Sequence, residues 1–269
     1  MNATGFKRLV RALVPQALLT PVERRLFRVR WEGNFPDWAA ALAASSGYAA
    51  EEITARVTAA ARLVREGRAR YERDGVAFQE PPAPWPALDF VRGGRDPAGG
   101  LKVLDFGGSL GSLYFQNRPQ LGDCVPLRWS VVEQPPLAAV GRREFETEEL
   151  RFYSSLAEAC DAGMPDVLLM ASVLCYLPAP FVILGELLRL APNRVVIERT
   201  GMVTEGKSHL TVQHVPRSIY RASYPCWFFA REELLAAFAG RYRLVHEARD
   251  EVATPAGLEF RSFHFARIA

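Results

Sequence analysis

The sequence predicts an α/β fold with one open sheet of seven strands, of which five are parallel and the last two form a C-terminal antiparallel hairpin. Short apolar runs alternate with helical segments from Leu101 onward, which is the pattern of a parallel sheet with right-handed crossovers. A turn of small residues at 107–111 directly follows the first of these runs. Only the turn-rich link 250–257 separates the last two runs, which favours an antiparallel pair.

The length of 269 residues fits one large domain with an elaboration. We divide the chain into an N-terminal helical extension over 1–86 and a second domain over 87–269. Helices are expected at 38–44, which is rich in alanine, and at 51–71, which carries an apolar stripe at helical spacing. The proline-rich stretch 81–86 is typical of a stiff connector between the two parts.

The remaining elements follow from the alternation itself. Strands are expected at 102–106, 129–133, 150–153, 166–171, 194–198, 242–248 and 258–268. Helices are expected at 136–145, 181–190 and 234–238. In such a sheet, ligands bind in the crevice outside the carboxyl ends of the parallel strands, so we examine the residues that end each strand.

The first two strands end in acidic residues. Asp105 stands at the end of the first strand, and glycines at 107, 108 and 111 permit positive φ and let the backbone approach a ligand closely. Glu133 ends the next strand. A carboxylate about 20 residues or more beyond a glycine turn suits a ribose diol, because each oxygen accepts a hydroxyl proton. These features indicate a cofactor that contains a nucleoside.

Two classes of cofactor suit this arrangement. The dinucleotide fingerprint G-x-G-x-x-G would need glycines where Ser109 and Ser112 stand. The pattern D-x-G-x-G-x-G fits better, with Ser109 in place of the middle glycine. In this the chain resembles motif I of class I S-adenosylmethionine (SAM)-dependent methyltransferases, whose fold is Rossmann-like. The resemblance implies that Asp105 helps to hold the methionine amino group, that the turn passes under the cofactor, and that Glu133 binds the ribose.

The same resemblance extends to the other strand ends. It implies that Ser154, which is otherwise an ordinary loop serine, lies by the adenine, and that Ser172 lies between cofactor and acceptor. The implied cofactor-binding residues are Asp105, Phe106, Gly107, Gly108, Ser109, Gly111, Glu133, Gln134, Ser154, Ser172 and Val173. The stretch 171–177 has no carboxylate and no Asn-Pro-Pro-Tyr, which argues against N-methylation of adenine or an amide and favours a hydroxyl or carboxyl oxygen as the acceptor.

The segment 199–227 is long for a connector and dense in aromatic and polar residues, so we expect a lid over the acceptor pocket. His214 is the first candidate for a catalytic base and His209 the second, because imidazole titrates near neutrality; a structural role is equally open for each. Arg199 is a candidate for binding an acidic acceptor or the methionine carboxylate, or for a surface salt bridge. Substrate contacts are expected from Thr200, Gln213, Tyr220, Ser223, Tyr224 and Trp227.

A narrower resemblance covers nearly the whole chain from about residue 30. The chain is similar to a family of bacterial methyltransferases whose acceptor is generally unassigned and whose members are often associated with surface-polysaccharide or natural-product pathways. The segments that carry it are 33–38, 46–48, 71–74, 105–111, 132–135, 172–177, 199–200, 213–216 and 223–225. It implies SAM as the cofactor and a sugar-derived or natural-product acceptor.

The composition of the chain limits the kinds of partner that we expect. The net charge of +3 argues against nucleic acid as the main partner. The basic N-terminus, with Lys7, Arg8 and Arg11, is either a solvated helix face or a surface for an anionic membrane. The four cysteines form no C-x-x-C pair or zinc motif, so we expect no metal and a cytoplasmic location. We expect no signal peptide and no transmembrane segment, and leave open whether the N-terminal helices cap the site or form a homodimer.

Three functions stay open at this point. The first is a SAM-dependent methyltransferase. The second is a catalytically inactive, methyltransferase-like scaffold, motivated by the absent carboxylate at 171–177 and by the basic N-terminus. The third is a nicotinamide-dependent oxidoreductase, against which Ser112 speaks because it occupies the position of the third glycine.

Overall fold

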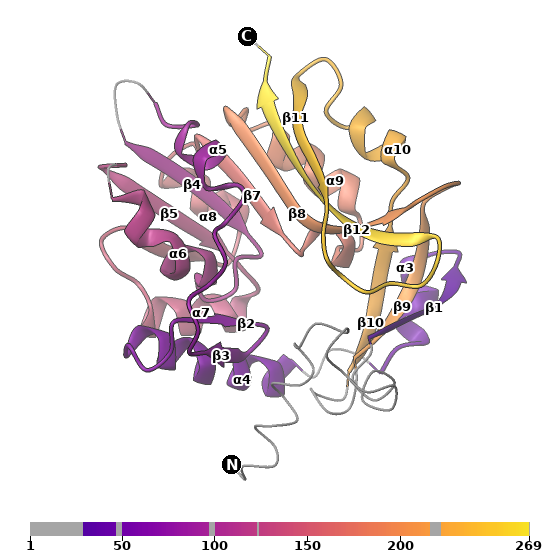
Figure 1. The fold of residues 1–269 in the computed structure, drawn as a ribbon, viewed down its shortest axis with the longest axis horizontal. Helices are drawn as coiled ribbons and strands as arrows, with labels where there is room; N and C mark the ends of the chain where they lie inside the picture. The colour runs from indigo at the N-terminus through magenta and orange to yellow at the C-terminus, as the bar shows by residue number, and fades with distance from the viewer. Residues whose placement is uncertain (1–28, 47–49, 97–99, 123, 216–221, 269) are drawn as a thin grey trace.

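A computed structural model describes residues 29–46, 50–96, 100–122, 124–215 and 222–268 (Figure 1). Its largest element is a seven-stranded sheet in the order β11-β12-β8-β7-β4-β5-β6. The strands are β4 (Leu101–Phe106), β5 (Leu127–Val132), β6 (Leu150–Tyr153), β7 (Val167–Ala171), β8 (Arg194–Val203), β11 (Tyr242–Arg249) and β12 (Leu258–Arg267). The first five run parallel, and β12 pairs antiparallel with both β8 and β11. The predicted Rossmann-like sheet with its C-terminal hairpin is confirmed.

The strand order places a switch point beside β4. From β4 the chain moves outward to β5 and β6, and then returns to β7 on the other side of β4. Connections that diverge in this way leave a crevice at the carboxyl ends of the two central strands, which is where open α/β sheets bind ligands.

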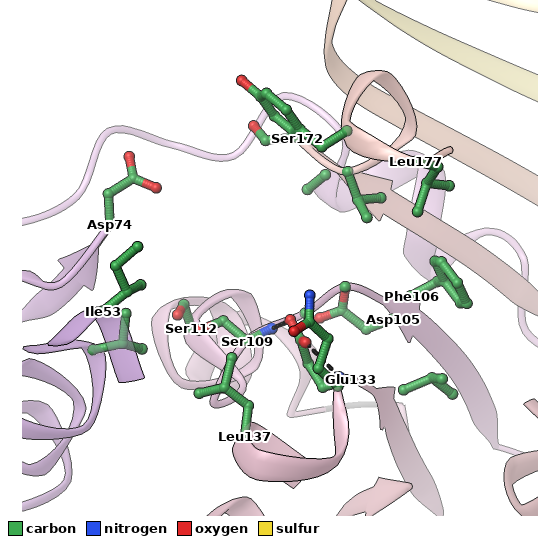
Figure 2. A pocket seen from close by; sticks show the side chains of 18 of the residues that line it. Ile53, Asp74, Asp105, Phe106, Ser109, Ser112, Glu133, Leu137, Ser172 and Leu177 are labelled. Atoms are coloured by element: carbon green, nitrogen blue, oxygen red, sulfur yellow. Dashed lines mark hydrogen bonds between the residues drawn. The ribbon is translucent and has the colours of Figure 1, made fainter. Parts of the chain in front are cut away.

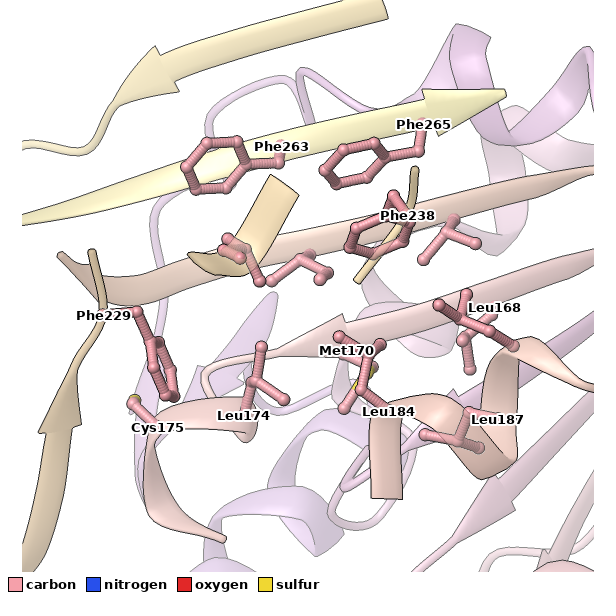
Figure 3. Close-up of a cluster of buried hydrophobic side chains, with 14 of the residues drawn as sticks. Leu168, Met170, Leu174, Cys175, Leu184, Leu187, Phe229, Phe238, Phe263 and Phe265 are labelled. Carbon is pink, nitrogen blue, oxygen red and sulfur yellow. The ribbon is translucent and has the colours of Figure 1, made fainter. Parts of the chain in front are cut away.

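Helices cover both faces of the sheet (Figure 1). They are α5 (Leu88–Arg92), α6 (Ser112–Asn117), α7 (Pro135–Glu144), α8 (Leu156–Asp161), α9 (Pro180–Leu188) and α10 (Arg231–Ala236), with the short 3-10 helices η2 (Arg118–Leu121) and η3 (Leu174–Tyr176). Strand β7 shows the two-sided burial: Leu168 and Met170 join one core with α9, and Val167 and Leu169 join the other (Figure 3). This is why the central strands are continuous apolar runs rather than alternating ones.

Aromatic packing closes the first core under the C-terminal hairpin. Phe238 stacks on Phe265 with ring centroids 3.7 Å apart, and Phe263 lies beside them (Figure 3). Rings of this size contribute strongly to burial, so the antiparallel strand β12 is fixed on β8 by packing as well as by hydrogen bonds.

The N-terminal part carries both expected helices and also strands that we did not predict. Helix α3 (Trp38–Ala43) begins at Asp37, whose side chain accepts a hydrogen bond from the backbone of Ala40 at 2.8 Å. Helix α4 (Ala50–Arg65) ends before Gly67, which has φ +68°, and so does not reach residue 71. The hairpin of β2 (Tyr71–Arg73) and β3 (Val76–Phe78) follows.

The expected lid is in part a second sheet. Strand β8 runs on to Val203, and the segment behind it contributes β9 (His209–His214) and β10 (Ser223–Phe228). With β1 (Arg30–Phe35) these strands form an antiparallel sheet in the order β1-β9-β10. The expectation of a loop there was wrong because β9 pairs with a strand about 180 positions earlier in the chain, and such pairing leaves no local signal. No described helix is both long and apolar enough to cross a membrane.

Candidate functional site

A cavity of about 720 Å³ lies at the carboxyl ends of the parallel strands. Its volume falls within the range of small-molecule sites, about 300–1,000 Å³. Of the residues expected to bind a cofactor, those in its wall are Asp105, Phe106, Gly107, Gly108, Ser109, Glu133, Gln134, Ser154, Ser172 and Val173 (Figure 2). Gly111 does not line it; with φ +81° it makes the bend that begins α6. Within the described residues, no group of three or more histidines, cysteines or acids is placed to hold a metal ion.

The glycine turn folds tightly over Asp105. A Cβ at Gly108 would lie 2.4 Å from the Asp105 carboxyl group, so no side chain fits at that position. Ser109 has φ +55°, a left-handed conformation that costs a residue with a Cβ about 1–2 kcal/mol. The turn therefore keeps its glycine-like path with a serine in the middle.

Asp105 is a buried acid with one unpaired oxygen. The side chain is fully buried, Oδ2 accepts a hydrogen bond from Trp129 Nε1 at 3.0 Å, and Oδ1 has no partner among the described residues. The pKa of Asp105 is raised to about 7, chiefly by burial; the hydrogen bond from Trp129 opposes this rise, and the charges of Glu133 and Glu198 contribute to it. A cationic group bound beside the turn would favour the ionised form, so the site is suited to a positively charged ligand.

Glu133 ties the second strand end to the same turn. Its Oε1 accepts a hydrogen bond from the Ser109 backbone at 3.1 Å, and its Oε2 accepts one from the Gln134 backbone at 2.7 Å (Figure 2). Burial raises the pKa of this carboxyl group, and both backbone bonds oppose that shift. Each oxygen keeps a second lone pair, so a vicinal diol can donate one hydrogen bond to each. We call Asp105, the turn 107–111 and Glu133 the cradle.

The β2–β3 hairpin supplies a wall that the sequence analysis did not foresee. Glu72 is buried, accepts a hydrogen bond from the Ser112 hydroxyl at the start of α6, and accepts one from the Gly75 backbone at 3.3 Å. The pKa of Glu72 is raised to about 8, chiefly by burial and in part by the charge of Asp74. A neutral, hydrogen-bonded acid therefore docks the hairpin next to the cradle. No local pattern in the sequence of 71–74 predicts this role, because the contact of Glu72 with Ser112 joins residues 40 positions apart.

A further part of the cavity wall carries hydroxyl groups held in a network. Gln213 Oε1 accepts hydrogen bonds from Tyr176 and from Trp31, both at 2.9 Å, and Gln213 Nε2 donates to the Tyr224 oxygen at 3.0 Å. Burial raises the pKa of Tyr176 well above its ordinary value. Both tyrosines line the cavity, whereas Gln213 lies behind them as their anchor. Sequence reasoning missed Tyr176 because the strand pairing that brings Gln213 to it is long-range.

Arg199 and Ser172 lie side by side in this wall. Arg199 Nε donates to Ser172 Oγ at 2.7 Å, and both residues adopt left-handed φ values, +46° and +54°. Ser154 lines the third strand end, where its hydroxyl bonds to Glu158 at 3.0 Å.

Several expected acceptor contacts lie away from the cavity wall. His214 Nε2 is 3.6 Å from Glu32 Oε2 across the β1–β9 pair, and His209 stacks near Phe228 with ring centroids 6.1 Å apart. Both histidines stand at the ends of β9, and that strand belongs to the second sheet, so the structure brings neither to the cradle. Also outside the wall are Thr200, Gln213 and Ser223, which are buried, and Trp227, which stacks near Phe229. Tyr220 and the basic N-terminus lie outside the described residues.

Comparisons with known proteins give similarities of structure. No protein-family model matches the chain, and no curated protein does. The N-terminal domain of EvdMO1, solved with S-adenosylhomocysteine (SAH) and D-fucose, is 14% identical over 82% of this chain and 98% of that one, with a TM-score of 0.49. The 1,6-didemethyltoxoflavin-N1-methyltransferase of Burkholderia thailandensis, solved with 1,6-didemethyltoxoflavin and SAH, is 20% identical. The match covers 83% of this chain and 92% of that one, with a TM-score of 0.45. CalS10, an amino pentose methyltransferase of Micromonospora echinaspora, is 16% identical. The match covers 68% of this chain and 89% of that one, with a TM-score of 0.44.

Proposed function

We propose that this chain is a SAM-dependent methyltransferase that acts on an oxygen atom of a small-molecule acceptor. The observation that carries the proposal is the cradle. A buried acid, one of whose oxygens has no partner among the described residues, lies under a turn in which Gly108 leaves no room for a side chain, and a second acid is held at the next strand end. Both acids and the turn border one cavity, and the chemistry of this set of groups suits an adenosyl ligand that carries a positive charge.

The two acids of the cradle bind different parts of the cofactor in this proposal. Glu133 accepts the hydrogen bonds of the ribose diol, and Asp105 offers negative charge to the cationic amino acid part. When bound, SAM supplies an electrophilic methyl group on a sulfonium. The protein contributes mainly orientation, because it holds the acceptor oxygen in line with the methyl group.

Proton acceptance from the acceptor hydroxyl is assigned to the exposed carboxylate of Asp74, since both histidines lie outside the cavity wall. Asp74 lines the cavity at the tip of the β2–β3 hairpin, and its charge raises the pKa of Tyr176. The described part of the segment 1–86 thus serves as one wall of the acceptor side, through residues such as Trp38 and Ile53.

Calorimetric titration tests this function. SAM and SAH are expected to bind at one site per chain with micromolar affinity. NADH is expected not to bind, because Ser112 stands where the dinucleotide fingerprint has its third glycine, whose missing side chain lets the helix pack closely against the strand. Binding of NADH in preference to SAH would instead support the oxidoreductase. Mass spectrometry with a panel of hydroxylated acceptors then separates the enzyme, which adds one methyl group, from a scaffold, which binds SAH and methylates nothing.

A further inference from the structure

The cavity has a second charged centre, distinct from the cradle, at Arg199. Three arginines with nearly equal side-chain exposure differ in their ion pairs. The side chains of Arg118, Arg199 and Arg261 are 31%, 32% and 32% exposed. Arg118 binds Glu149 through two nitrogens, and Arg261 Nε lies 2.6 Å from Glu259. Within the described residues, the one ion pair of Arg199 joins its Nη1 to Glu198 Oε2 at 4.0 Å, longer than a hydrogen bond.

The backbone around Arg199 is held in an unusual conformation. Arg199 and Ser172 both have left-handed φ values although neither is glycine, and a residue held in such a conformation costs about 1–3 kcal/mol. The Ser172 backbone donates to the Glu198 carbonyl at 2.9 Å, and the Arg199 backbone donates to Ser262 Oγ at 3.2 Å. These bonds hold the strained pair in place. Strain of this kind, at a cavity wall, is typical of a site that positions a functional group.

A hydrogen bond to Ser172 orients the side chain of Arg199. Its Nε bonds to Ser172 Oγ at 2.7 Å, which fixes the guanidinium plane. Glu198 does not compete for the guanidinium nitrogens at bonding distance, because its Oε1 accepts a hydrogen bond from Trp85 at 2.7 Å and its Oε2 stays 4.0 Å from Nη1. The planar edge of the fork is therefore available to a ligand in the cavity.

We infer that Arg199, positioned by Ser172, binds the carboxylate of the acceptor, so that the substrate class is hydroxylated carboxylic acids. This inference rests on the proposed function. The guanidinium edge matches a carboxylate with two parallel hydrogen bonds. Burial raises the pKa of Glu198 and of Asp250, and the charge of the nearby Arg199 opposes that shift in each. These neighbouring acids offset part of the guanidinium charge, so a monoanion suits the site better than a phosphate dianion.

The neighbouring wall fits the rest of such a molecule. The hydroxyl groups of Tyr176 and Tyr224, joined through Gln213, offer hydrogen bonds to a hydroxylated body, and Val173 and Leu177 offer apolar contact. The carboxylate end and the hydroxylated end of an acceptor thus meet different groups of one wall.

Matched pairs of acid and neutral probes test the inference, in the presence of saturating SAH. One pair is 4-hydroxybenzoate and 4-hydroxybenzamide, and the other is D-glucuronate and D-glucose. By calorimetry, the wild-type chain is expected to bind at least one acid about 10-fold or more tightly than its neutral partner, as a charge-assisted hydrogen bond predicts. The pair that shows the preference separates an aromatic acid from a sugar acid.

Variants then assign the preference to Arg199. In Arg199→Met the preference for the acid is expected to vanish while SAH affinity stays within about twofold, and in Arg199→Lys it is expected to be intermediate because a lysine lacks the fork. Ser172→Ala is expected to reduce the preference, because it removes the hydroxyl group that accepts the hydrogen bond from Arg199 Nε. Arg231→Met is the control, since Arg231 pairs with Glu247 away from the cavity.

Three results would overturn the inference while leaving the proposed function intact. They are equal binding of acid and neutral probes by the wild-type chain, an acid preference that survives in Arg199→Met, and a tenfold loss of SAH affinity in that variant, which would assign Arg199 to the cofactor. Failure of the wild-type chain to bind SAH is a different outcome, because it would contradict the proposed function and therefore also this inference.

Discussion

Asp105→Asn is expected to weaken SAH binding about 10- to 100-fold at pH 8, because it removes the negative charge that lies under the turn. Asparagine keeps the size of the side chain and an oxygen that can accept the hydrogen bond from Trp129, so the fold is expected to persist. Binding is measured by calorimetry, and folding by circular dichroism and urea titration. Glu259→Gln is the matched control, because Glu259 is also a buried acid but lies outside the cavity wall.

Asp105→Asn is also expected to change how the free energy of unfolding depends on pH. Burial raises the pKa of Asp105 to about 7, above its ordinary value of 3.8, so the ligand-free fold binds a proton that the unfolded chain has lost. This group's contribution to the free energy of unfolding is therefore present in full below about pH 4 and is lost as the pH rises through 7, at up to about 1.4 kcal/mol per pH unit. As the pH rises from about 4 to about 7, the Asp105→Asn chain is expected to gain stability relative to the wild type, and above pH 7 the difference is expected to level off.

Cofactor affinity is expected to follow the opposite course. A cation binds the ionised form of Asp105, so wild-type affinity for SAH rises between pH 6 and pH 8, while the variant loses this part of the increase. An Asp105→Asn chain that binds SAH as tightly as the wild type at pH 8 would show that this acid does not belong to the cofactor site.

Gly108→Ala is expected to destabilise the fold by about 1–3 kcal/mol and to reduce SAH affinity at least tenfold. Its new Cβ would lie 2.4 Å from the Asp105 carboxyl group, so either the turn or the acid must move. Urea unfolding gives the stability, and calorimetry gives the affinity.

Ser109→Gly in the same turn is the matched comparison. It removes a Cβ from a left-handed position, which relieves about 1–2 kcal/mol, and it adds backbone freedom to the unfolded chain, which costs about 0.5–1 kcal/mol. The net change in stability is expected to stay within about 1 kcal/mol, with SAH binding retained. Equal tolerance of both substitutions would contradict the tight packing of this turn over Asp105.

The sequence predicted most of the large sheet because its signals are local. Apolar runs, strand-ending acids and the glycine turn all lie within short windows, and β4 with its turn is read directly from residues 101–111. The cradle is predictable for the same reason, since the carboxyl ends of adjacent parallel strands meet at one edge of the sheet.

The acceptor side was less predictable because it depends on distant pairing. Strand β1 reaches β9 across most of the chain, and only that pairing brings Trp31 to Gln213 and so sets the two wall tyrosines. The histidines stood out in the sequence for their chemistry, yet their positions at the ends of β9 keep them outside the cavity wall. The strained conformation of Arg199 has no sequence signal, because left-handed φ is ordinarily marked by glycine or asparagine.

A crystal structure of the SAH complex would show whether the cradle binds the adenosyl group. We expect both ribose hydroxyls to lie about 2.5–3.0 Å from the two carboxylate oxygens of Glu133, with the amino acid part of SAH over the turn 107–111 and beside Asp105. An adenosyl group bound elsewhere, or a Glu133 carboxylate pointing away from the ribose, would contradict this expectation.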